Sequence, residues 1–85
     1  MLQAKVDPEV QALLDGDPKR TVEAILMARG QLDELLDCLP SEVTVHHQYR
    51  LIASVSVSAP AGALRGLVSM REVKAIEPVR NVSRC

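Results

Sequence analysis

The segment VTVHHQYRLIASVSVSA, residues 43–59, decides the fold. Its side chains alternate with a period of two in two adjacent runs, which is typical of strands. In the first run, one face would carry Val43, Val45, His47 and Tyr49, and the other Thr44, His46 and Gln48. In the second run, one face would carry Ala53, Val55, Val57 and Ala59, and the other Ser54, Ser56 and Ser58. The pattern predicts an antiparallel pair of strands with one side in water.

Further elements are predicted upstream of this pair. Residues 21–28 (TVEAILMA) are mostly apolar, and their length and β-branched residues favour a strand buried on both faces, with a helix as the alternative. Residues 32–39 place leucines at i, i+3, i+4 and i+7, which predicts an amphipathic helix ended by a proline. A short helix over about residues 8–15 is predicted before both, because Asp7 caps it and Pro8 occupies its first position.

Downstream of the serine-rich run, Pro60 starts a helix that carries Leu64 and Leu67 on one side, and a last strand is predicted over about residues 73–79. The complete order, after the leading helix, is strand, helix, strand, strand, helix, strand. We therefore predict an α+β protein with the ferredoxin-like βαββαβ arrangement. A four-stranded antiparallel sheet would have two helices on one face, an open second face and a short extra N-terminal helix.

The domain boundaries follow from this order. Residues 1–20 would hold the N-terminal helix and a linker, residues 21–80 the ferredoxin-like domain, and residues 81–85 a C-terminal tail. The chain of 85 residues suffices for a single core.

Composition excludes several classes of partner. The net charge is −1, Lys and Arg are scattered, and Tyr49 is the sole aromatic residue, so neither a basic stripe nor stacking rings indicate a nucleic-acid partner. No apolar run is long enough to span a bilayer, and the opening stretch MLQAKVDPEV lacks the apolar segment of a signal peptide. We therefore expect no membrane partner and a cytoplasmic location.

No residue pattern predicts catalysis, a metal or a cofactor. His46 and His47 are adjacent in a predicted strand, so they are expected to point to opposite faces and not to bind one ion. Cys38 lies beside the apolar stripe of residues 32–39, where a buried thiol is expected. Neither a Ser/His/Asp set nor a phosphate-binding loop is present. We expect a protein that is not an enzyme and binds no cofactor.

From Tyr49 onward the chain resembles the subtilisin propeptide family, which includes free-standing protease inhibitors. The family has an aromatic residue near the end of its second strand, here Tyr49, followed by a strand of small and β-branched residues, here 52–58. A helix with paired leucines comes next, here Leu64 and Leu67. The V-x-x-V-E strand of the family matches residues 73–77, VKAIE, and a short tail ends the chain.

The resemblance implies a domain that binds a subtilisin-like serine protease as its inhibitor, its intramolecular folding chaperone, or both. In the family the open sheet face packs against two parallel helices of the protease, and an acidic residue, here Glu77, caps the N-termini of those helices. The docking face would carry Thr44, His46, Gln48, Ser54, Ser56 and Ser58. The tail would lie in the substrate cleft through Val82, Ser83, Arg84 and Cys85, with Cys85 beside the catalytic serine. Many members carry a second acidic residue where this chain has Val79.

The sequence leaves two alternatives. One is a non-inhibitory protein–protein interaction module of the same fold, which recruits a partner through the sheet face or dimerises through an edge. The other is a small-molecule regulatory domain of the amino-acid-binding type, for which Arg29-Gly30 would be the glycine-bearing loop after the first strand. The sequence does not predict the oligomeric state.

Overall fold

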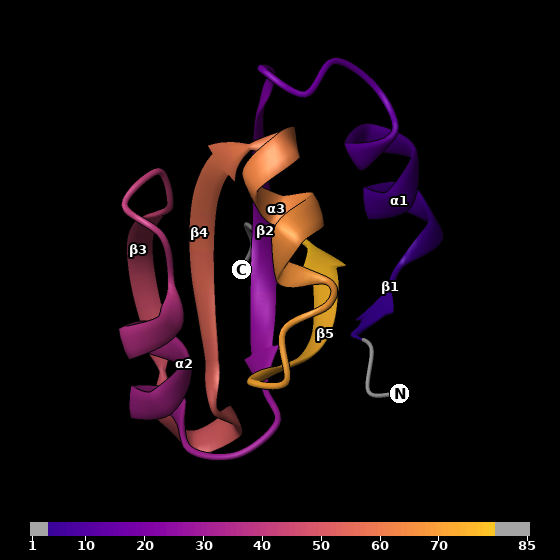
Figure 1. Ribbon diagram of the computed structural model, residues 1–85. Helices are drawn as coiled ribbons and strands as arrows, with labels where there is room; N and C mark the ends of the chain where they lie inside the picture. Colours follow the sequence, from indigo (N-terminus) through magenta and orange to yellow (C-terminus); the bar gives the residue numbers. More distant parts are fainter. Residues whose placement is uncertain (1–3, 80–85) are drawn as a thin grey trace, which may run out of the picture.

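The computed structural model describes residues 4–79 of the chain (Figure 1). Its elements are, in chain order, β1 (Lys5–Val6), α1 (Pro8–Leu14), β2 (Thr21–Ala28), α2 (Leu32–Cys38), β3 (Thr44–Tyr49), the 3-10 turn η1 (Arg50–Ile52), β4 (Ser54–Pro60), α3 (Ala61–Leu67) and β5 (Val73–Pro78). The α+β class is therefore confirmed, and each helix and strand predicted from the sequence is present within a few residues of its predicted ends.

The strands form one sheet in the order β1-β5-β2-β4-β3. Neighbouring strands are antiparallel from β5 to β3, whereas β1 pairs with β5 in parallel. The prediction of a four-stranded antiparallel sheet is wrong in this detail, because β1 is a fifth strand. A strand of two residues is too short to show alternation, so no pattern marked it. The amide of Asp7 donates to the carbonyl of Ile76 at 3.1 Å and carries the pairing up to the start of α1.

The leading helix begins as its sequence predicts. The Asp7 carboxylate accepts a hydrogen bond from the amide of Glu9 at 2.9 Å, and Pro8 occupies the first helical position, where no amide is needed. The helix packs against α3, β5 and β2. It is therefore joined to the same core as the rest of the domain.

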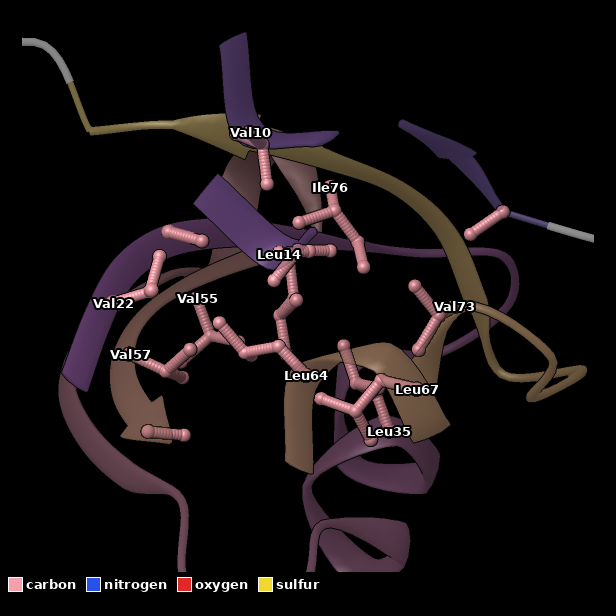
Figure 2. Packing of buried hydrophobic residues seen from close by; sticks show 14 of the residues in the cluster. Val10, Leu14, Val22, Leu35, Val55, Val57, Leu64, Leu67, Val73 and Ile76 are labelled. Carbon is pink, nitrogen blue, oxygen red and sulfur yellow. The ribbon is translucent and has the colours of Figure 1, made fainter. Parts of the chain in front are cut away.

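All three helices contribute to a single hydrophobic core on one side of the sheet (Figure 2). The buried helical residues are Val10 and Leu14 of α1, Leu32 and Leu35 of α2, and Ala61, Leu64 and Leu67 of α3. The sheet supplies Val22, Ala24, Leu26, Val55, Val57, Ala59, Val73 and Ile76. The prediction of two covering helices is thus extended to three, since α1 shares the core. Within residues 4–79, no helix combines the length and apolar composition that a membrane crossing requires.

Burial in β2 is one-sided. Val22, Ala24 and Leu26 are buried against the helices, while Glu23 is exposed and Ile25 is half-buried on the other side. The prediction of a strand buried on both faces is wrong, because no described helix covers the second face. The strand reads as continuously apolar because Ile25 and Met27 shield the small side chains of its neighbours on that second face.

Cys38 is exposed at the end of α2, and not buried as its position beside the leucine stripe suggested. The reason is helical phase. Leu32 and Leu35 point into the core and Leu39 packs against it, whereas Cys38 lies to the side of the stripe that these leucines form.

Candidate docking face

The side of the sheet opposite the helices is called the open face here. Strand register assigns its members, because residues paired directly across antiparallel strands lie on the same face. They are Glu23, Ile25 and Met27 of β2, Ser54, Ser56 and Ser58 of β4, Thr44, His46, His47 and Tyr49 of β3, and Ala75 and Glu77 of β5. The predicted open face therefore exists in the described part of the chain, and it carries the predicted row of serines.

A β-bulge at His46 changes which residues of β3 belong to this face. The register shifts between Val45 and His47, so that two residues of β3 stand where β4 has one. His46 bonds the hydroxyl of Ser58 through Nε2 at 2.9 Å, and His47 pairs with Ser56, so both histidines lie on the open face. The expectation that they point to opposite faces is wrong. A bulge turns adjacent side chains to the same side and restarts the alternation out of phase.

The same bulge removes Gln48 from the predicted docking set. Gln48 pairs with Val55, which is fully buried under the helices, so Gln48 lies on the helix-covered side. Its Oε1 accepts a hydrogen bond from Arg50 at 3.1 Å, and Arg50 also contacts Asp33 of α2 at 3.3 Å. Tyr49 takes the place of Gln48 on the open face, opposite Ser54.

The serines of β4 form a low floor in the middle of the open face. Ser54 is fully buried and donates its hydroxyl to the carbonyl of Ile52 at 3.0 Å, and Ser56 is 7% exposed. Larger side chains stand on both sides, from β2 (Ile25 and Met27) and from β3 (His47 and Tyr49). Ser54 and Ser56 therefore expose little surface on this face, whereas Ser58 is half-buried.

A hollow of about 260 Å³ lies on this face beside Ser56. It is lined by Glu23, His46, His47, Ser56, Val57 and Val79. Sequence alternation missed this grouping, because the bulge has no signature in the residue types. Despite the two histidines and the carboxylate, no group of three metal-ligating side chains is placed to hold a metal ion among residues 4–79.

The His46–Ser58 contact has the distance of a nucleophile and its general base. Such a pair needs a third group that orients the imidazole and donors for a developing oxyanion. Within the described residues, the hydrogen bonds of His46 include no carboxylate contact. The geometry therefore matches a surface hydrogen bond that holds the His46 ring against β4.

Glu77 lies on the open face within β5, exposed and opposite Ile25 of β2. The strand order places β5 two strands from β4, so Glu77 and the serine floor are about 10 Å apart across the sheet. Val79, which follows Glu77 by two residues, is 41% exposed. The predicted tail residues Val82, Ser83, Arg84 and Cys85 lie outside the described residues.

A second hollow, of about 500 Å³, lies at the other end of the fold beside the loop after β2. Its lining residues are Arg29, Gly30, Glu34, Asp37, Cys38, Arg71 and Glu72. The Arg29 guanidinium donates to the carbonyl of Arg71 at 3.1 Å and to that of Val73 at 3.4 Å, which ties this loop to the start of β5. In this loop the arginine therefore has a structural role.

The thiol of Cys38 faces this second hollow. Desolvation by the surrounding walls raises the pKa of the thiol, and the negative charge and hydrogen bond of Glu72 raise it further, with smaller contributions from Asp37 and Glu34. A raised pKa keeps the thiol protonated, so Cys38 lacks the thiolate character of a reactive cysteine.

Comparison of the chain with models of protein families, with characterised proteins and with solved structures found no match.

Proposed function

We propose that this protein binds a subtilisin-like serine protease through the open face and the C-terminal tail, as an inhibitor, a folding chaperone, or both. The proposal takes the βαββαβ portion, β2 to β5, as a ferredoxin-like domain of the propeptide kind. The observation that carries it is that the described helices lie on one side of the sheet. All three share one core, and the other face carries a row of small hydroxyl side chains on β4.

The width of the open face suits the two parallel helices that the resemblance implies. Four neighbouring strands, β5-β2-β4-β3, span about 14 Å at the usual spacing of about 4.8 Å. Two packed helices have axes about 8–10 Å apart. A sheet of this width therefore supports both helices side by side, one over β5 and β2 and the other over β4 and β3.

The composition of the face favours close packing. Ser54 and Ser56 are short, so no long side chain projects from the middle of the face against which a helix would pack. Small side chains also lose little rotamer entropy when they are covered. The face is therefore suited to docking against helices with little conformational cost.

Glu77 supports the same mode of binding. Its carboxylate is exposed on the open face, at the side of the sheet where the first helix would lie. The amides at the N-terminus of a helix are unpaired and carry partial positive charge, so a carboxylate in contact with them is stabilising. The tail from Val82 to Cys85 would then continue into the substrate cleft as an added strand.

The experiment is a titration of the full chain into a broad-specificity subtilisin, with hydrolysis of a chromogenic peptide as the measure of inhibition. Binding is measured separately by calorimetry with a protease whose active site is blocked. We expect Ser56→Arg to weaken binding at least about tenfold, because a long charged side chain in the middle of the open face holds the helices away from the sheet. Ser41→Arg is the matched control, since Ser41 is exposed in the loop before β3.

Four further outcomes separate the parts of the proposal. Deletion of residues 82–85 should abolish inhibition while retaining binding to the blocked protease. Glu77→Gln should weaken binding without changing the fold, as checked by circular dichroism. Equal affinities for Ser56→Arg and Ser41→Arg would remove the open face from the mechanism, and a full chain that neither binds nor inhibits the protease would remove the function.

A further inference from the structure

Among residues 4–79, strand β3 is an edge of the sheet with no strand paired to its outer side. It pairs with β4 on one side, and every residue from Thr44 to Tyr49 is exposed. The opposite edge is β1, which is two residues long and offers little to pair with. The larger exposed apolar side chains of the described residues are Val45, Tyr49, Leu51, Ile52 and Val79. All except Val79 belong to β3 or to the turn that follows it.

The outer edge of β3 lacks most of the features that keep edges from pairing. Edge strands are commonly protected by lysine, proline, inward-pointing charges or a bulge. Residues 44–49 (TVHHQY) contain no Lys, Asp, Glu or Pro, and their types favour extended backbone. Of the protective features named above, β3 has the bulge at His46.

This bulge determines which strand fits the edge. Along residues 44–49 the side chains point, in order, to the open, covered, open, open, covered and open sides. An ordinary strand alternates strictly, so beyond the bulge its side chains would point to the wrong faces. The order in β3 reads the same in both directions. An antiparallel second copy of β3 therefore matches it at every position.

The match holds in one register alone. Thr44 then faces Tyr49 of the second copy, Val45 faces Gln48, and His46 faces His47, with each pair on one side of the sheet. A shift by one residue would place Thr44 opposite Gln48, which point to different faces. The β-branched and aromatic residues Thr44 and Tyr49 are a favourable cross-strand pair.

Charges beyond the ends of the strand favour the same arrangement. Glu42 precedes β3 and Arg50 follows it, and both are exposed. Antiparallel pairing brings Arg50 of each copy beside residues 42 and 43 of the other, so opposite charges meet twice. A parallel arrangement would instead place like charges together.

We propose that the protein forms a dimer in which the β3 edges of two copies pair antiparallel about a two-fold axis normal to the sheet. The interface is isologous, as most dimer interfaces are. The two sheets become continuous, with the helices of both copies on one side and both open faces on the other. This inference goes beyond the proposed function and does not depend on it.

The test is sedimentation equilibrium of the full chain with reducing agent present, over concentrations up to about 1 mM. We expect the mass to rise from 9.3 kDa toward twice that value as concentration increases. Two double variants probe the register on the covered side, away from the open face. Val45→Lys with Gln48→Lys places like charges opposite each other in the dimer, and Val45→Lys with Gln48→Glu places opposite charges there. The dissociation constant of the dimer should be at least about tenfold higher for the first variant than for the second.

Each result decides the proposal. A wild-type chain that stays at 9.3 kDa overturns it, as do two variants with equal dissociation constants. Should the variants fail to fold, hydrogen exchange of the wild type at low and high concentration takes their place. The amides of residues 44–49 should gain protection with concentration, and association without that protection would overturn the proposal.

Discussion

Leu14→Ala tests whether the leading helix is part of the core. Leu14 is fully buried at the end of α1, in the cluster that includes Ile76 and Leu64 (Figure 2). Truncation of a fully buried leucine leaves a cavity and costs about 3 kcal/mol. A domain of this length has a free energy of unfolding of about 4–13 kcal/mol, so the loss is a large fraction of the total. The midpoint of thermal unfolding should fall by about 12–24 °C.

The assay is urea unfolding followed by circular dichroism, with the free energy taken from the midpoint and the slope. Leu13→Ala is the matched control, because Leu13 lies next to Leu14 but is half-buried. We expect it to cost less than half as much. A cost below about 1 kcal/mol for Leu14→Ala, or equal costs for the two variants, would mean that α1 contributes little to the core.

Two further predictions concern α3 and the second hollow. Gly66→Ala should raise the free energy of unfolding by about 0.5–1 kcal/mol, because a Cβ there meets nothing within 4 Å. Gly62→Ala should raise it less, since its Cβ would lie 3.4 Å from Pro18. Thermal melts that rank the two variants in the reverse order would contradict this. Cys38 should react slowly with a thiol reagent at pH 8, and faster as pH rises through its raised pKa, as measured by peptide-resolved mass spectrometry. Glu72→Gln should lower that pKa and speed the reaction at pH 8, and an unchanged rate would exclude Glu72 as a cause.

Most of the fold was predictable from periodicity because the described helices cover one face of the sheet. A sheet with helices on one face forces alternate residues of β4 to be apolar, and the strict alternation of Ser and Val from Ser54 to Ser58 follows directly from that constraint. The helix around Leu32 and Leu35 was equally visible, since its buried residues recur at helical spacing. Where every residue of a helix or strand follows the same burial pattern, that pattern can be inferred from the residue types.

The wrong predictions concern places where the burial pattern of a helix or strand is interrupted or too short to detect. β1 has two residues, Lys5 and Val6, and a period cannot be read from two positions. Cys38 lies beside the leucine stripe of α2 but is turned away from the core, although the next residue, Leu39, packs against it. The bulge at His46 leaves no mark in composition, because His, Gln and Thr are tolerated on either face of an exposed strand.

That bulge affects both proposals, although it involves a single extra residue. On the side of β4 it brings His46 and His47 together on the open face and turns Gln48 toward α2, so it decides which side chains a docked helix would meet. On the outer side it breaks the alternation of side chains, so a second, antiparallel β3 matches the order along the whole strand and a strictly alternating strand does not. A regular strand in this position would present the same main-chain groups to any extended segment, with no means of selecting among them. The irregularity therefore confers selectivity at the edge of the sheet while it sets the composition of the face.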